Sequence, residues 1–237
     1  MSSFSGKSVL VLGGSRGIGA AIVSRFASNG AKVVFTYLSS PEAAHALAAE
    51  TGSEAVRVDS GDRDALIALI SSLDPLDVLV VKSGILGAGD PLDMPPDDID
   101  RLFRINIHAP YHAAVAAART MPDGGRIIFI GSANADRTPM TGLAAYSASK
   151  SALKGMAKGL ARDFGARGIT VNVVQPGPTD TDMNPADGPL KDVMHGFMAI
   201  KRHATGSEIA GLVAYLAGPA AGIIPGAAYK IDGGFAA

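Results

Sequence analysis

Short apolar runs alternate with stretches of helical periodicity along the whole chain. The runs predict seven strands, at residues 9–12, 32–37, 55–58, 77–81, 127–130, 170–174 and 227–231. When a helix separates each strand from the next, the strands form a parallel sheet with helices on both faces. We therefore expect an α/β fold: a single doubly wound domain over residues 1–237, built on a seven-stranded parallel sheet.

The composition is that of a globular chain and excludes several classes of function. Hydrophobic residues make up 47% of the 237 residues, which is enough for a large core. The net charge of −1 gives no basic surface for a nucleic acid polymer or an anionic membrane. The chain has no cysteine, and no apolar run reaches about 18 residues. With no signal-peptide pattern at the N-terminus, we expect a cytoplasmic protein without a metal centre.

The first predicted strand runs through a glycine-rich turn into a helix. Gly13, Gly17 and Gly19 are spaced as G-x-x-x-G-x-G. Glycines let the backbone approach a pyrophosphate, and a helix N-terminus offers free N–H groups. We predict a Rossmann-type cofactor loop made of Gly13, Ser15, Arg16, Gly17, Ile18 and Gly19. The alternative is a turn that is rich in glycine for packing alone.

The end of the second predicted strand indicates which dinucleotide would bind. An NAD-selective site usually carries an acid about 20 residues past the glycines. Here Tyr37, Ser39 and Ser40 precede the first acid, Glu42. Hydroxyl groups together with the Arg16 guanidinium suit a 2′-phosphate better than a free 2′-hydroxyl. We therefore expect NADP(H) to be favoured over NAD(H); the alternative is that Arg16 is a solvated surface residue.

A tyrosine and a lysine lie four residues apart on a helix predicted to begin near Leu143. Tyr146 and Lys150 therefore share one face of that helix. A free phenol titrates near pH ~10, and a neighbouring ammonium brings its pKa toward the range useful for acid–base catalysis. Ser132 follows the fifth strand and offers a hydroxyl that would hold a carbonyl oxygen beside the tyrosine. The pattern Y-x-x-x-K is common by chance. The prediction that Tyr146 and Lys150 are catalytic therefore depends on which residues follow the other strands.

Several chemistry-bearing residues follow the predicted strands directly. The carboxyl ends of parallel strands meet at one edge of the sheet, where ligands bind. We expect one crevice to collect the glycine loop, Asp59, Ser60, Gly84, Ser132 and Pro176. Asp59 would bond an adenine amino group there.

The connection at residues 182–200 is long for a compact domain, and such segments are typically lids or binding loops. Methionine-rich surfaces adapt to varied shapes, which favours a modest apolar carbonyl as the substrate. The lid offers His195 as a polar contact and an apolar wall of Met183, Met194, Phe197 and Met198.

Small residues form a stripe along the helix of Tyr146, namely Ala148, Ala152, Gly155 and Gly159. Such a stripe allows close helix–helix approach, so we expect a homodimer or homotetramer, with packing inside the monomer as the alternative. His108 and His112 are also four residues apart. Without a third ligand near them, we interpret them as helix-surface or interface residues rather than as a metal site.

With these residues placed, the chain resembles the short-chain dehydrogenase/reductase family over its full length. The resemblance is carried by Gly13-x-x-x-Gly17-Ile18-Gly19, by Asn106, Ser132, Tyr146 and Lys150, and by Pro176-Gly177 with Thr181. It implies hydride transfer between NADP(H) and a carbonyl or alcohol. It also implies that Tyr146 donates the proton and that Ser132 orients the substrate oxygen.

The resemblance implies roles for further residues. Lys150 would lower the pKa of the tyrosine and bind the nicotinamide ribose, and Asn106 would hold a water in a proton relay. The nicotinamide carboxamide would lie against Pro176, Gly177, Thr179 and Thr181. A dimer or tetramer built on two helices is implied as well.

The chain departs from the family pattern at two places. Leu12 precedes the glycine loop where the family often has threonine. The family's Asn-Asn-Ala-Gly after the fourth strand reads Val81-Lys82-Ser83-Gly84. Lys82 places a flexible cation near the adenosine side of the site, where it either contacts phosphate or weakens cofactor binding.

A narrower resemblance, at residues 100–112 and 172–178, is to a bacterial branch of the family that binds cyclic-di-GMP in biofilm dispersal. It implies an alternative function, a regulator that binds this cyclic dinucleotide with or without catalysis. Of the three functions considered, NADPH-dependent reduction of a small carbonyl compound comes first and binding of cyclic-di-GMP second. A purely structural role is the third.

Overall fold

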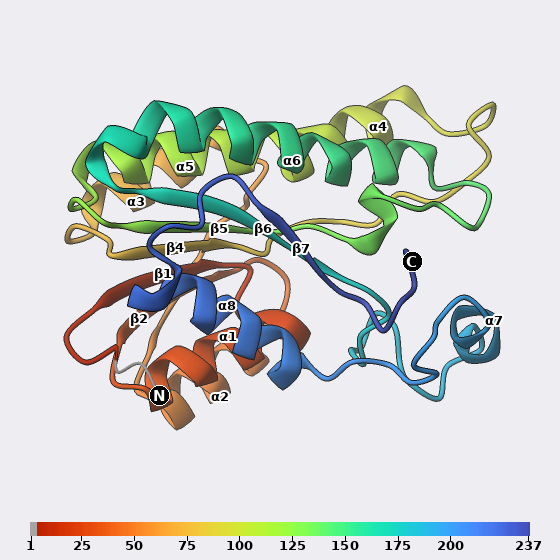
Figure 1. Cartoon of the computed structure of the whole chain (residues 1–237), viewed down its shortest axis with the longest axis horizontal. Helices are drawn as coiled ribbons and strands as arrows, with labels where there is room; N and C mark the ends of the chain where they lie inside the picture. The colour runs from red at the N-terminus through yellow and green to blue at the C-terminus, as the bar shows by residue number, and fades with distance from the viewer. Residues whose placement is uncertain (1–3) are drawn as a thin grey trace.

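The structure, a computed structural model, describes residues 4–237, so residues 1–3 of the expected domain lie outside it. Seven strands form one sheet in the order β3-β2-β1-β4-β5-β6-β7, and every neighbouring pair is parallel (Figure 1). The strands are β1 (Ser8–Leu12), β2 (Lys32–Tyr37), β3 (Glu54–Arg57), β4 (Val78–Val81), β5 (Arg126–Ile130), β6 (Thr170–Pro176) and β7 (Ala228–Ile231). The predicted α/β fold is confirmed.

Helices cover both faces of the sheet (Figure 1). One face carries α3 (Arg63–Ser72), α4 (Pro96–Phe103), α5 (Ala109–Thr120) and α6 (Ala144–Phe164). The other carries α1 (Gly17–Ser28), α2 (Pro41–Thr51) and α8 (Gly206–Ala217), while α7 (Lys191–Gly196) lies beyond the strand ends. Within residues 4–237, none of the helices has the length and apolar character needed to cross a membrane.

The central strands are apolar throughout because helices bury both of their faces. Side chains alternate across the sheet, so Leu10 and Leu12 of β1 enter the core beneath α3, α5 and α6. Val9 and Val11 of the same strand enter the core beneath α1 and α8. The same alternation divides β4 and β5 between the two cores. One strand therefore stabilises both layers of helices.

The strand order reverses between β1 and β4, because β1 is followed in sequence by β2 on its other side. A ligand crevice opens at such a switch point, outside the carboxyl ends of the strands. The backbone N–H groups of Lys82 and Ser83 both donate to the Leu12 carbonyl, at 3.0 and 2.7 Å. These bonds hold the residues after β4 directly beside the glycine turn after β1.

A π-helical turn, η1 (Arg104–His108), separates α4 from α5. Pro110 has no N–H to donate to the Asn106 carbonyl four residues earlier, so a regular α-helical ladder cannot continue here. The Ala109 N–H donates instead to the carbonyl of Arg104, five residues earlier. The wider turn places Asn106 in the interior, where its side chain is fully buried.

The side chain of Asn172 connects β6 to the segment before β7. It is fully buried; its Nδ2 donates to the Ile224 carbonyl at 2.6 Å, and its Oδ1 accepts from the Ala227 N–H at 2.9 Å. Because Asn172→Ala leaves two backbone groups without partners, we expect the free energy of unfolding to fall by about 2–4 kcal/mol. Urea unfolding at equilibrium measures this, with an unchanged denaturant slope. A fall below about 0.5 kcal/mol would contradict this account of the β6–β7 connection.

Candidate active site and cofactor cleft

Ser132 and Tyr146 meet at the carboxyl end of β5. Ser132 has an extended backbone and caps the short 3₁₀ helix η2 (Ala133–Ala135), its hydroxyl accepting from the Asn134 N–H at 3.2 Å. The Ser132 carbonyl accepts from Gln175 Nε2 at 3.1 Å, which fixes the backbone. The Ser132 hydroxyl is hydrogen-bonded to the Tyr146 phenol, two residues after the start of α6. The structure therefore brings the predicted proton donor and the predicted orienting hydroxyl together.

Lys150 lies one turn further along α6 and is buried at 6% exposure. Its ammonium donates to the Ile130 carbonyl at 3.2 Å and lies 5.8 Å from the centre of the Tyr146 ring. Burial, together with the nearby charge of Lys82, lowers the pKa of Lys150 to about 8. Lys150 is thus close to losing its proton near neutral pH.

Burial also raises the pKa of Tyr146, and the hydrogen bond from Ser132 lowers it only in part. The direction is opposite to the lowering by Lys150 that the resemblance implies, because burial of the phenol is the largest effect. Tyr146 is therefore firmly protonated at neutral pH. A protonated phenol is suited to give a proton rather than to take one.

Asn106 connects the π turn to two other parts of the site. Its Nδ2 donates to the Ile85 carbonyl at 2.9 Å and to Ser149 Oγ on α6 at 3.0 Å. Its Oδ1 accepts from the Ile85 N–H at 2.9 Å. A Cβ atom on Gly84 would lie 3.1 Å from the Lys150 ammonium and 3.2 Å from Asn106 Oδ1, so glycine is needed for this close approach.

The predicted cofactor loop forms a tight cradle between β1 and α1. Gly13 and Gly17 have φ angles of +80° and +53°, which favour glycine. A Cβ atom on Gly19 would lie 2.1 Å from the Gly13 carbonyl oxygen. Thr36 on β2 accepts from the Gly13 N–H through its hydroxyl, and from the Gly14 N–H through its carbonyl. Ser15, Arg16 and Ile18 lie within the same turn, and Arg16 is 3.8 Å from Asp182.

The carboxyl end of β2 agrees only in part with the prediction. Ser39 and Ser40 follow the strand and lie at or near the surface, with Ser40 at the start of α2. Tyr37 is instead buried in the core, and its hydroxyl contacts His45 Nε2 of α2 at 3.3 Å. The Tyr37 side chain therefore packs in the core, apart from the residues of the cleft.

Arg57, the last residue of β3, was not predicted. Its exposed guanidinium donates from Nε to the Leu38 carbonyl at 3.4 Å, which places the side chain beside Ser39. The sequence signal for Arg57 was available, since it is the last but one residue of the predicted strand 55–58, which neighbours β2 in a doubly wound sheet. It adds a second cation to the region predicted to hold a 2′-phosphate.

Asp59 and Ser60 follow β3, as expected. Asp59 Oδ1 accepts from the Gly61 N–H at 2.8 Å. Ser60 lines a cavity of about 460 Å³ that opens between the start of α3 and η1, and His108 and His112 line its other side. Among residues 4–237, no three His, Asp or Glu side chains are grouped in a way that could hold a metal ion.

The segment after β6 reaches across the cleft to the glycine turn. A Cβ atom on Gly177 would lie 2.6 Å from the Cα atom of Asp232, so Pro176-Gly177 is packed closely against the end of β7. Thr179 Oγ1 donates to the Gly177 carbonyl at 2.9 Å. The Thr181 methyl group lies 2.9 Å from the position of a Cβ on Gly17. The two predicted halves of the cofactor site are therefore in contact.

The segment 182–200 contains α7 and packs its last part beside Ser132. Met198 is buried against Ala133 and Phe235, and the Phe197 ring packs edge-on against Phe235 at 5.9 Å. Met194 is half-buried, whereas Met183 is 68% exposed. Only Phe197 and Met198, of the four predicted wall residues, pack in this apolar cluster. His195 is bonded to His203, Nε2 to Nδ1, at 3.0 Å.

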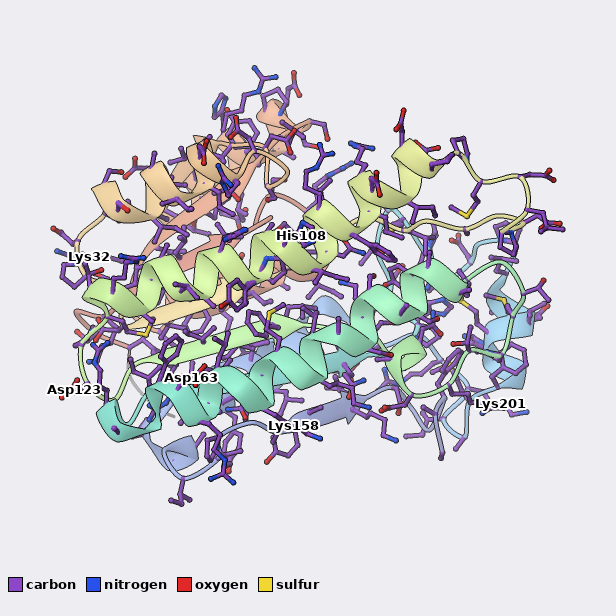
Figure 2. All side chains as sticks on the ribbon, turned by 90° about the horizontal axis from the view of Figure 1, so that it is seen from above. Lys32, His108, Asp123, Lys158, Asp163 and Lys201 are labelled. Carbon is purple, nitrogen blue, oxygen red and sulfur yellow. The ribbon has the colours of Figure 1, made fainter. Side chains whose placement is uncertain are left out.

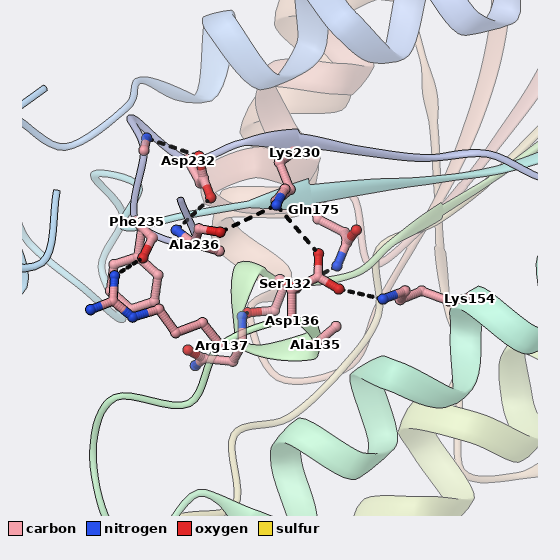
Figure 3. Close-up of polar contacts among 12 residues, drawn as sticks. Ser132, Ala135, Asp136, Arg137, Lys154, Gln175, Lys230, Asp232, Phe235 and Ala236 are labelled. Carbon is pink, nitrogen blue, oxygen red and sulfur yellow. Dashed lines mark hydrogen bonds and ion pairs between the residues drawn. The ribbon is translucent and has the colours of Figure 1, made fainter. Parts of the chain in front are cut away.

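A polar network fixes the C-terminal residues against the loop after Ser132 (Figure 3). Asp136 contacts Lys154 of α6 and, at 3.9 Å, Lys230 of β7. Arg137 donates to the Phe235 carbonyl at 2.7 Å, and its guanidinium lies 5.7 Å from the centre of the Phe197 ring. The buried Asp232 carboxylate accepts from the N–H groups of Gly234 and Ala236.

The charges in the cleft fit a dinucleotide phosphate. Arg16, Lys82 and Lys150 lie near one another, and each of the two lysines has its pKa lowered by burial and by a neighbouring cation. Within residues 4–237, Arg16 alone of the three is paired with a carboxylate. The glycine cradle supplies backbone N–H groups and close approach, and the cations supply positive charge. This donor set suits an anionic dinucleotide such as NADP(H).

Comparison with known proteins agrees with this geometry. The family model described as Enoyl-(Acyl carrier protein) reductase matches residues 13–236. The cyclic-di-GMP-binding biofilm dispersal mediator protein of Escherichia coli is 63% identical and is aligned over 100% of both chains. The 3-oxoacyl-(acyl-carrier-protein) reductase MabA of Mycobacterium avium is 35% identical, over 98% of this chain and 91% of that protein.

Two solved structures are similar over almost the whole chain. One, described as BdcA in complex with NADPH, has a TM-score of 0.97 and 63% identity over 99% of this chain and 96% of that chain. The other, a short-chain dehydrogenase/reductase from Serratia marcescens, has a TM-score of 0.95 and 50% identity over 99% of both chains. The resemblance inferred from the glycine turn and the strand-end residues is confirmed: this chain belongs to the short-chain dehydrogenase/reductase family.

Proposed function

We propose that this protein is an NADPH-dependent oxidoreductase that transfers hydride to a small carbonyl substrate. The observation that carries the proposal is the contact between the Ser132 hydroxyl and the protonated Tyr146 phenol, with the buried Lys150 one turn away. This cluster faces the same strand ends as the glycine cradle. The reductases among its relatives, and the NADPH bound to the similar BdcA structure, support the proposal.

In this proposal, different residues of the chain bind different parts of the cofactor. The pyrophosphate lies on the turn from Gly13 to Gly19, and the 2′-phosphate lies near Arg16, Arg57, Ser39 and Ser40. Asp59 and Ser60 line the adenosine side, and Gly84 approaches the cofactor beside the Lys150 ammonium. The nicotinamide side is held by Pro176, Gly177, Thr179 and Thr181. When bound, NADPH supplies the hydride that is added to the substrate carbon.

Tyr146 gives its phenolic proton to the carbonyl oxygen of the substrate. The Ser132 hydroxyl donates a hydrogen bond to the same oxygen and so holds it beside the phenol. The raised pKa of Tyr146 keeps the proton on the phenol until a substrate oxygen that is gaining negative charge takes it. Lys150 binds the nicotinamide ribose, and its charge favours the phenolate that remains.

Asn106 acts as a positioning residue in this scheme and holds a water in the relay that returns a proton to Tyr146. Both hydrogens of Asn106 Nδ2 are donated, one to Ile85 and one to Ser149. The water would therefore be held by an oxygen atom of Asn106. Ile85 lies one residue past Gly84, so Asn106 fixes the backbone on which the cofactor would rest.

We further propose that residues 1–237 are a single domain in which residues 182–200 act as the substrate lid. Phe197 and Met198 form the apolar wall, because they pack beside Ala133, the residue after Ser132. His195 secures the lid through its bond to His203. A cytoplasmic location belongs to the same proposal.

A homodimer or homotetramer is proposed on the outer surface of α5 and α6, which lie side by side (Figure 2). Gly155 and Gly159 face open space, since nothing lies within 4 Å of a Cβ atom built on either. Packing inside the monomer therefore does not account for the small-residue stripe. The mass of the protein in solution, measured by light scattering after gel filtration, tests this arrangement.

Binding of cyclic-di-GMP is the second candidate function. It is favoured by one observation, the 63% identity to the cyclic-di-GMP-binding biofilm dispersal mediator protein of Escherichia coli. The two functions share a phosphate-binding cleft in this proposal. Competition between cyclic-di-GMP and NADPH in a binding titration distinguishes a shared site from separate sites.

The Tyr146→Phe variant tests the proposed chemistry. Removing the phenolic proton is expected to lower kcat by about 10²–10⁴-fold, because general acid catalysis contributes a factor of this size. NADPH oxidation is measured against a panel of aldehydes, ketones and diketones, and NADPH binding should be unchanged. A wild-type protein that binds NADPH but reduces no member of the panel would favour the cyclic-di-GMP regulator instead.

Arg57→Ala tests the assignment of the 2′-phosphate region. A charge-assisted hydrogen bond to phosphate is lost, so the Kd for NADPH is expected to rise by about tenfold or more. The Kd for NADH should stay the same, because NADH carries no 2′-phosphate. Arg25→Ala, at a half-buried arginine on α1 that bonds Ser207, is the matched control. Equal weakening of both cofactors would place Arg57 elsewhere.

Lys150→Met tests the charge of the buried lysine through pH-dependent stability. The pKa of Lys150 is about 8 in the folded protein and 10.5 as the ordinary value, so the unfolded chain binds more protons between these pH values. The destabilisation from burying the charge is therefore complete below pH 8 and disappears as the pH rises past 10.5. We expect the variant to melt above the wild type at pH 7, with a difference that shrinks toward pH 10.5. A difference that does not depend on pH would contradict the buried charge.

A further inference from the structure

Lys82 stands where the family has asparagine. It follows β4 directly, and its N–H donates to the Leu12 carbonyl at 3.0 Å, one residue before the glycine cradle. Gly84, two residues further on, approaches the Lys150 ammonium. Lys82 therefore lies beside the glycine cradle and near Lys150.

The ammonium of Lys82 has no counter-charge in the described part of the chain. No carboxylate or carbonyl within residues 4–237 pairs with it, although the residue is partly buried. The neighbouring Ser83 hydroxyl is also buried and has no hydrogen-bond partner there. A buried cation without a partner is costly, so a site that keeps one is suited to an anionic ligand.

The charged and titratable groups around Lys82 are mostly cationic. Arg16 faces it from the glycine turn, and Lys150 faces it from α6. The Tyr146 phenol is neutral at physiological pH, and the acid Asp182 lies beside Arg16. Lys82 is thus close enough to both Arg16 and Lys150 for the positive charges to repel one another. An anion placed near Lys82 would relieve this repulsion.

We propose that Lys82 is a cofactor-binding residue, whose ammonium contacts the pyrophosphate of NADPH beside the glycine cradle. This inference rests on the proposed NADPH-dependent function and adds a contact that asparagine at this position cannot supply. Because the anion neutralises Lys82, it also removes a repulsion felt by Lys150. Cofactor binding thus favours the charged form of the catalytic lysine.

The test compares the Kd of NADPH for the wild type, Lys82→Met and Lys82→Arg, measured by NADPH fluorescence. Methionine keeps the length of the side chain without its charge, so the Kd is expected to rise by about tenfold or more. Arginine keeps the charge and should remain close to the wild type. Lys32→Met, at an exposed lysine that begins β2 (Figure 2), is the control for loss of a positive charge elsewhere. The melting temperature of each variant establishes that it is folded.

The pH dependence of the same Kd tests the electrostatic coupling between Lys82 and Lys150. Lys150 loses its proton near pH 8 in the wild type, so NADPH binding should weaken as the pH rises from 7 to 9. In Lys82→Met the repulsion is gone, the pKa of Lys150 rises, and the weakening should move to higher pH.

Two outcomes overturn the proposal and differ from each other. If Lys82→Met binds NADPH as tightly as the wild type, or more tightly, Lys82 does not contact the phosphates and the proposed function is unaffected. If the wild type itself does not bind NADPH, both the inference and the proposed function fail.

Discussion

The close approach of the chain segments that follow β1, β4 and β5 is the constraint on which the site depends. Asn106 holds the segment after β4 through two bonds to Ile85, and it reaches α6 through Ser149. Gly84 is thereby pressed against the Lys150 ammonium, which is in turn bonded to the last residue of β5. A side chain at residue 84, or a regular helix at residue 106, would separate these parts.

Most of the fold and the central residues of the site could be predicted from the sequence, because their signals are local. The apolar runs gave the seven strands, and strand-end position was enough to collect the glycine turn, Ser132 and Pro176. Tyr146 and Lys150 needed only helical spacing. Lys150 was nevertheless expected to lower the pKa of Tyr146. The pKa is raised instead, because the phenol is buried, and spacing in the sequence does not reveal burial.

Features set by tertiary packing were not predictable in the same way. Tyr37 is found in the core beside α2 because the space between sheet and helix can hold its ring, a fact that strand position does not contain. The π turn at Asn106 had a sequence signal in Pro110, but a proline near a helix start is also compatible with a regular helix. Arg57 and Lys82 could be assigned to the cofactor cleft only once their neighbours in space, which are distant in sequence, were known.

Residues 232–236 are anchored beside the proposed substrate wall. Phe235 is buried against Met198 and Ala133, and Asp232 and Arg137 hold the backbone on either side of it. Replacing Phe235 by a smaller side chain would therefore widen the apolar cluster beside Ser132 without changing Ser132, Tyr146 or Lys150.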